Sequence, residues 1–160
     1  MTDTKSEEVA ESRVEGRSRM SGLEYMRKLA AGELPASGMA RLIGFELAEV
    51  DEGYAVITVE SDERHSNGIG IAHGGLAATL LDSATGCAIN TMMPAGRIFT
   101  TLEMKINYVR PVRSGTGLLR CEARVIHAGS RVATAEGRVT GADGKLYAHG
   151  TATCMLFQAR

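Results

Sequence analysis

The pattern of apolar and polar positions changes several times along the 160 residues, and each change marks a predicted element. Apolar and polar residues alternate at 44–50 and 54–59, on either side of the turn residues Asp51-Glu52-Gly53. A period of two is typical of strands with one buried face. Four more alternating segments are predicted as strands, at 98–109, 118–128, 131–140 and 146–157. Their short connections favour a meandering antiparallel sheet.

Residues 73–92 follow a different pattern, because they are apolar nearly all round. A helix of that kind is buried, with other elements around it, and Pro94 and Gly96 mark its end. A shorter helix is predicted near the N-terminus, where Ser21 can cap a segment whose apolar side chains share one face: Leu23, Met26, Leu29 and Ala30. The sequence therefore predicts an α+β fold, with a curved antiparallel sheet wrapped around one long buried helix.

Composition along the chain divides it into three regions. Residues 1–20 are polar and are expected to form a disordered tail. Residues 21–37 hold the short N-terminal helix and a linker, and residues 38–160 form one domain, which is long enough to bury a fair core.

The overall charge and cysteine usage exclude several classes of protein. The formal net charge is −1, which argues against a nucleic-acid partner. No apolar run is long enough to span a membrane, and no secretory signal is visible. The cysteines Cys87, Cys121 and Cys154 have neither metal-ligand spacing nor an even count. We expect a cytoplasmic protein without a metal site.

The start of the buried helix carries the candidate chemistry. Helix-initiating N–H groups lack internal partners and lie at the positive end of the dipole, so Gly74 can bind an oxyanion or carbonyl. Asp82 lies about two turns further on, roughly 12 Å along the axis. An unpaired carboxylate in an apolar helix is costly. Asp82 is therefore either a hydrogen-bonded core residue or a functional one.

Asn67, then His73-Gly74-Gly75, then Asp82 resembles the hotdog-fold acyl-CoA thioesterases, most of all their PaaI-like group, in this order of elements. The resemblance covers residues 38–157 and includes Tyr108-Val109-Arg110-Pro111-Val112 with Gly115. It implies a hotdog fold and a homodimer with two active sites at the interface, and many members pair dimers into tetramers. It also implies hydrolysis of an acyl-CoA to a free acid and coenzyme A, without a cofactor.

The resemblance assigns roles to individual residues. Gly74 would hold the oxyanion, Asn67 would position the carbonyl or the water, and Asp82 would act as base or nucleophile from across the interface. His73 is either a general acid or a residue that shapes the helix start. A hydroxyl that helps to hold the water is expected at Thr100 or Thr101, and Thr100, 18 residues after Asp82, matches best. Only one of the two can face the site, because neighbouring strand residues point to opposite faces.

The anionic coenzyme is expected to meet basic side chains. The candidates for substrate binding are Gly75, Arg110, Arg113 and Arg131, although surface arginines are also common without such a role. Two other functions fit the same fold: a non-hydrolytic acyl-CoA-binding module and a hotdog dehydratase. The acyl group, the choice between dimer and tetramer, and the choice between coenzyme A and acyl carrier protein stay open.

Overall fold

The computed structural model describes residues 19–113 and 115–159, so most of the predicted tail at 1–20 lies outside the described residues. The helices are α2 (Gly22–Ala30), α3 (Gly38–Ile43), the 3₁₀ turn η1 (Glu63–His65) and α4 (Gly74–Thr91). The strands are β1 (Glu46–Asp51), β2 (Tyr54–Glu60), β3 (Arg97–Tyr108), β4 (Leu118–Ala128), β5 (Val132–Gly141) and β6 (Leu146–Gln158). These bounds agree closely with the predicted long helix and strands.

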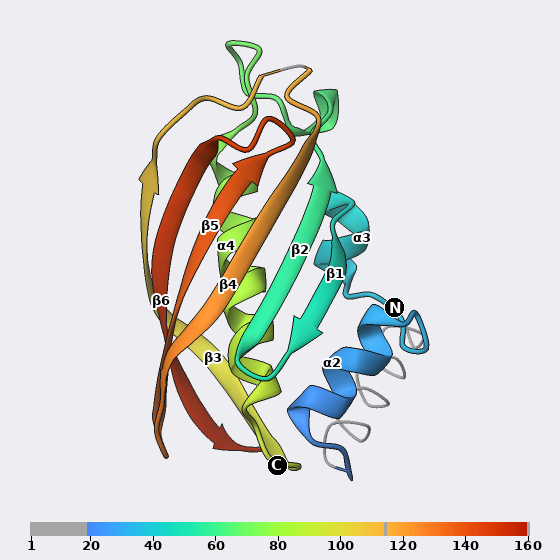
Figure 1. Ribbon diagram of the computed structural model, residues 1–160, viewed down its shortest axis with the longest axis vertical. Coiled ribbons are helices and arrows are strands. Elements are labelled where there is room, and N and C mark those ends of the chain that lie inside the picture. The colour runs from blue at the N-terminus through green and yellow to red at the C-terminus, as the bar shows by residue number, and fades with distance from the viewer. Residues whose placement is uncertain (1–18, 114, 160) are drawn as a thin grey trace, which may run out of the picture.

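The six strands form one antiparallel sheet with the order β1-β2-β4-β5-β6-β3. The sheet curves around α4, and α2 and α3 lie beside β1 (Figure 1). The prediction of a meander through all four late strands is wrong in one connection. β3 pairs with β6 and not with β4, because the segment 109–117 carries the chain from β3 at one edge to β4 beside β2.

The face of the sheet that contacts α4 is built from small side chains. Ala and Cys take many of the inward positions of β4, β5 and β6, and these residues are nearly inaccessible to solvent: Cys121, Ala123, Ala133, Ala135, Ala148, Ala152 and Cys154. At Gly137 a Cβ would lie 3.0 Å from a methyl group of Leu81. The sheet can therefore approach the helix closely, which packs the two layers at high density.

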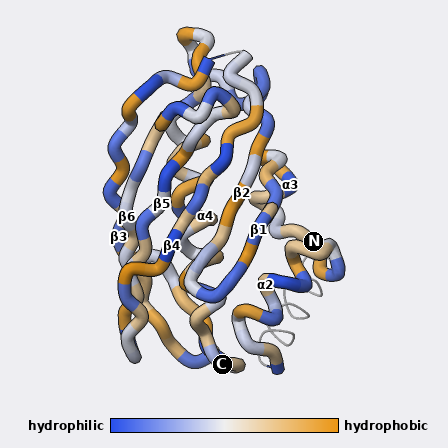
Figure 2. The backbone as a smooth tube through the Cα atoms, viewed as in Figure 1, coloured by the Kyte–Doolittle hydropathy of each residue, from blue (hydrophilic) through white to orange (hydrophobic). Residues whose placement is uncertain are grey.

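The alternation seen in the sequence corresponds to the two faces of this sheet. Hydrophobic and hydrophilic positions alternate along the strands in Figure 2, and burial alternates in step, most regularly along β5. α4 has eleven buried residues, from Leu76 to Thr91. The predicted fold, a curved antiparallel sheet around one long buried helix, is confirmed.

The N-terminal helix packs directly on the end of α4. Ser21 caps α2 by accepting a hydrogen bond from the Glu24 N–H at 3.3 Å, as predicted. The buried face matches the predicted one only at Met26, which is buried together with Gly22 and Tyr25. Leu23 and Leu29 are half-buried, and Ala30 is exposed. Glycine is required at position 22, since a Cβ there would lie only 1.6 Å from a carbonyl oxygen of α4.

Candidate active site at the start of α4

His73 is the N-cap of α4, and its ring fixes the first turn of the helix. The Gly75 N–H donates a hydrogen bond to His73 Nδ1 at 2.8 Å, which satisfies one of the orphan donors of the helix start. A Cβ on Gly75 would lie 2.8 Å from the same nitrogen. Gly75 therefore serves the cap in this structure, and its N–H is not available to a substrate.

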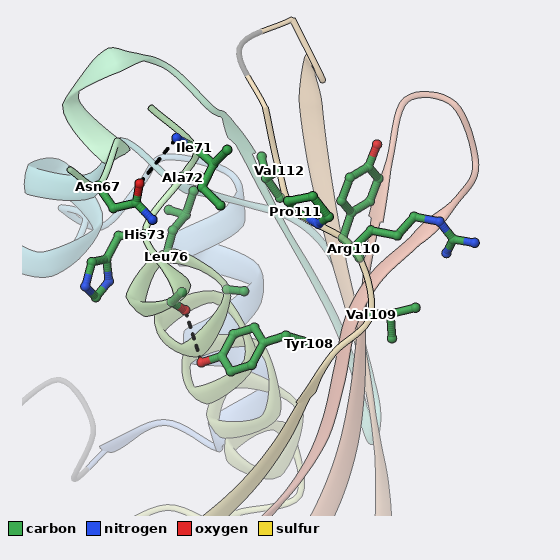
Figure 3. A pocket seen from close by; sticks show the side chains of 13 residues that line it. Asn67, Ile71, Ala72, His73, Leu76, Tyr108, Val109, Arg110, Pro111 and Val112 are labelled. Atoms are coloured by element: carbon green, nitrogen blue, oxygen red, sulfur yellow. Dashed lines mark hydrogen bonds between the residues drawn. The ribbon is translucent and has the colours of Figure 1, made fainter. Parts of the chain in front are cut away.

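Gly74 presents the donor that the sequence predicts. Among residues 19–113 and 115–159 we find no acceptor for its N–H. The Tyr108 hydroxyl donates to the Gly74 carbonyl at 3.3 Å (Figure 3), and atoms of the Tyr108 ring would lie 3.3–3.5 Å from a Cβ at Gly74. The ring thus covers one side of this turn. A side chain at position 74 would crowd the approach of a ligand to the free N–H.

Asn67 is fixed by its own loop, and this leaves its amide nitrogen free to act. Its side-chain oxygen accepts hydrogen bonds from the N–H groups of Ile69 at 3.0 Å and Ile71 at 3.3 Å. These bonds orient the carboxamide, so the NH₂ group is the end that remains for a ligand. The ordinary turn role of Asn67 and its predicted ligand role are therefore compatible.

Asn67, His73 and Gly74 line one pocket of about 330 Å³. Its other walls are largely apolar and come from the start of α4, from the segment that follows β3, and from β6: Ile71, Ala72, Leu76, Ala77, Tyr108, Val109, Arg110, Pro111, Val112 and Tyr147 (Figure 3). The predicted oxyanion and carbonyl contacts are thus together in a site that favours electrostatic interactions, because apolar walls weaken screening.

Asp82 lies in a different place, on the wall of a larger groove of about 840 Å³ between α4, β3, β1 and the N-terminal helices. The Thr101 hydroxyl donates a hydrogen bond to Asp82 Oδ1 at 2.8 Å. The carboxylate therefore has one partner that orients it, and the groove leaves it open to a ligand. Asp82 is neither an unpaired core charge nor part of an ion pair among the described residues.

Of the two threonines, Thr101 lies beside Asp82, so the preference for Thr100 is wrong. Thr101 pairs with the buried Cys154 on β6, whereas Thr100 pairs with the exposed Met155. Adjacent strand residues point to opposite faces, so Thr100 faces away from α4. Counting 18 residues from Asp82 fails because the turn between α4 and β3 sets the register of the strand.

Gly74 and Asp82 cannot act on the same atom within one copy of the chain. They are eight residues apart on a straight helix, which is about 12 Å along its axis. A general base must come within about 3 Å of the proton that it removes, or reach it through one water. The two halves of the predicted site are therefore separate in the monomer.

The arginines predicted to bind substrate are not gathered in one copy. Arg110 lines the pocket of Asn67, but its guanidinium extends away from α4 (Figure 3) and donates to the Leu146 carbonyl at 2.7 Å. Arg113 is exposed in the same loop region, where its backbone forms an isolated antiparallel β-bridge with Ile71. Arg131 lies in the β4–β5 turn at the opposite end of the sheet (Figure 1).

His65 is a structural residue that the sequence did not indicate. It is 7% exposed. Its Nδ1 accepts from the Asp62 N–H at 3.1 Å, and Nε2 donates to the Ile43 carbonyl at 2.8 Å. The His73 N–H also donates to the His65 carbonyl at 2.7 Å. His65 thus holds the loop that carries Asn67 against the start of α4.

Two of the three cysteines, Cys121 and Cys154, are buried, and Cys87 is half-buried. Burial raises the pKa of the Cys121 thiol to about 12, and burial also raises the pKa of Cys154.

Within the described ranges, no group of three or more His, Cys, Asp or Glu residues could hold a metal ion. In the same part of the chain, no helix is long and apolar enough to cross a membrane.

Comparison with known proteins agrees with this geometry. The sequence profile of the thioesterase superfamily matches residues 69–148. Human acyl-coenzyme A thioesterase 13 is 29% identical over 132 residues, which are 81% of this chain and 93% of that protein. A conserved Pseudomonas aeruginosa protein of known structure is 34% identical, with a TM-score of 0.71, over 76% of this chain and 95% of its own.

A phenylacetic acid degradation-related protein from Ralstonia eutropha has 30% identity and a TM-score of 0.74, and the match covers 82% of this chain and 98% of that protein. The chain belongs to the thioesterase superfamily and has the hotdog fold of its PaaI-like members. It is a thioester hydrolase by class.

Proposed function

We propose that the protein hydrolyses acyl-CoA thioesters in composite sites of a homodimer. Each site would combine Gly74 and Asn67 of one copy with Asp82 and Thr101 of the other. The observation that carries the proposal is the separation of two incomplete half-sites on α4. One has a free N–H and a fixed amide, and the other has an oriented carboxylate in an apolar groove. The name of the human relative supports acyl-CoA as the substrate class.

In the proposed reaction, the Gly74 N–H and the Asn67 NH₂ polarise the thioester carbonyl. Asp82 of the second copy removes a proton from water, and the water oxygen bonds to the carbonyl carbon. The negative charge that develops on the carbonyl oxygen is stabilised by the Gly74 N–H. Collapse of the tetrahedral intermediate breaks the carbon–sulfur bond, and the thiolate takes the proton from Asp82. The products are a free acid and coenzyme A.

A second route uses the same residues, with Asp82 as nucleophile. The carboxylate would displace the thiolate to give a mixed anhydride, which water then hydrolyses. A single turnover in ¹⁸O-labelled water tests for the second route. Label in the Asp82 carboxylate would indicate the anhydride, because attack of water on the Asp82 carbonyl carbon leaves one labelled oxygen there. Label confined to the product acid would exclude that attack, since a general base and an anhydride opened at the acyl carbon both place the label in the product.

The function is tested by hydrolysis of phenylacetyl-, benzoyl-, hexanoyl- and palmitoyl-CoA, followed with a thiol reagent. We expect turnover by the wild type and a loss of at least a hundredfold in kcat for Asp82→Asn, with an unchanged melting temperature. Equal activity of Asp82→Asn would refute the assigned mechanism. Tight acyl-CoA binding without turnover on any substrate, including acyl carrier protein thioesters, would favour the binding module instead.

The composite site is tested by mixing two inactive variants, Asn67→Ala and Asp82→Asn. In a mixed dimer one site carries both substitutions and the other carries neither, so one site of the two is intact. Random reassortment after unfolding and refolding together should restore about a quarter of the wild-type activity. Unmixed variants, refolded separately, are the control. Failure of the mixture to recover any activity would place each site within one subunit.

A further inference from the structure

We propose that the acyl chain lies in the groove between α2 and α4, and that α2 limits the chain length to about ten carbons. This inference rests on the proposed function, because it begins from Asp82 as the group that meets the thioester. It concerns the groove of about 840 Å³ that starts at Asp82 and Thr101. Its volume is within the range of sites that enclose small molecules, about 300–1,000 Å³.

The groove follows one face of α4. Asp82, Gly86 and Asn90 all line it, and their spacing of four residues places them on the same side of the helix. At Gly86 the ring of Phe99 takes the space of a side chain, since its atoms would lie 3.1 Å from a Cβ. The ring thus forms part of the floor between the carboxylate and the far end.

The far end is closed by a contact between α4 and α2. Asn90 and Met26 are both buried, and the Asn90 amide donates to Met26 Sδ at 2.9 Å. Gly22 holds α2 against α4 at this end, where its N–H donates to the Met93 carbonyl at 2.8 Å. The groove therefore has a wall that depends on the docking of α2.

The length follows from the helix. Asp82 and Asn90 are eight residues apart, or about 12 Å along α4. A fully extended peptide advances at most about 3.6 Å per residue, which is three backbone bonds, or roughly 1.2 Å per bond. An extended alkyl chain advances about as much per bond, so about ten of its bonds fill the distance from Asp82 to Asn90. A phenylacetyl or benzoyl group would fill only part of it.

The walls match an alkyl chain in chemistry. Apolar side chains line both sides of the groove, from α2, the linker, β1, β2 and β3: Met26, Leu29, Leu34, Phe45, Leu47, Ile57 and Phe99. The amide of Asn90 already donates to sulfur. Polar side chains at Ser37, Glu46 and Ser83 also line the groove, so its walls are largely and not wholly apolar.

The test is kcat/KM for a series of straight-chain acyl-CoAs from four to sixteen carbons, together with phenylacetyl- and benzoyl-CoA. We expect an optimum near ten carbons for the wild type. Leu29→Trp fills the groove from α2 and should lower kcat/KM for decanoyl-CoA at least tenfold, with little change for butyryl-CoA. Met26→Ala opens the far end and should move the optimum to longer chains. Leu23→Trp is the matched control, because Leu23 is on the same helix but does not line the groove.

A binding measurement separates this inference from the proposed hydrolysis. Calorimetry with the non-hydrolysable thioether decyl-CoA should give at least tenfold weaker binding to Leu29→Trp than to the wild type, with butyl-CoA unaffected. An absence of hydrolysis with this difference intact would refute the function and keep the groove. Hydrolysis with identical chain-length profiles in all variants would refute the groove. A change of oligomeric mass in Leu29→Trp without a change of profile would show that the groove is covered by another copy, which also refutes it.

Discussion

Replacement of Thr101 by Val removes one hydrogen bond and leaves the shape of the side chain almost unchanged. The hydroxyl that donates to Asp82 Oδ1 at 2.8 Å is lost, while the β-branched side chain that suits a strand is kept. A hydrogen bond to a charged group contributes about 1.5–3 kcal/mol. If Asp82 must be oriented to reach the water, kcat should fall roughly 10- to 150-fold, since 1.36 kcal/mol is a factor of ten.

The matched control is Thr100→Val, because Thr100 has the same side chain on the opposite face of the same strand. We expect it to retain full activity, and we expect Thr101→Ser to recover most of the loss. The assay is the steady-state rate of thiol release from the best acyl-CoA, with kcat and KM determined separately and melting temperatures measured alongside. Unchanged kcat in Thr101→Val, or an equal loss in Thr100→Val, would refute the assignment of the hydroxyl.

Three further predictions concern packing and capping. Gly22→Ala should lower the melting temperature by several degrees, because overpacking typically costs about 1–3 kcal/mol. Gly38→Ala is the control and should be neutral, since its Cβ would meet nothing within 4 Å. Equal melting temperatures of the two variants would contradict the close contact of α2 with α4. His73→Ala should lower the free energy of unfolding in urea by about 1 kcal/mol, because the hydrogen bond that caps the Gly75 N–H is lost, and His73→Asn should restore most of it. If His73→Ala is as stable as the wild type, the ring has no capping role. Cys121 should resist iodoacetamide in the native protein at pH 8, since a pKa of about 12 keeps the thiol protonated there. Mass spectrometry measures the rate of its alkylation. A rate equal to that in denaturant would show that the buried site opens to solvent.

Local signals predicted most of the elements. α4 was expected from residue 73 to residue 92 and spans Gly74–Thr91 with His73 and Met92 as its caps. Its continuous apolar pattern and its helix-ending residues act within a few positions of the chain, so they can be seen in the sequence. α3 was missed, although Ser37 caps it and Gly44 ends it in a left-handed conformation with φ 81°. A helix of six residues carries too little periodicity to be distinguished from a linker.

The sequence by itself identified the candidate residues at the start of α4, partly through the cap and glycines of the helix, which act over short distances, and partly through the resemblance to a family. Asn67 and Gly74 were predicted, and the structure brings them into one pocket. Only the tertiary structure decided that Thr101 and not Thr100 meets Asp82, that β3 pairs with β6, and that Asp82 opens into a groove under α2. These features depend on strand register and on contacts between residues far apart in the chain. A shift of one residue turns a strand side chain to the other face, and no local pattern fixes that register.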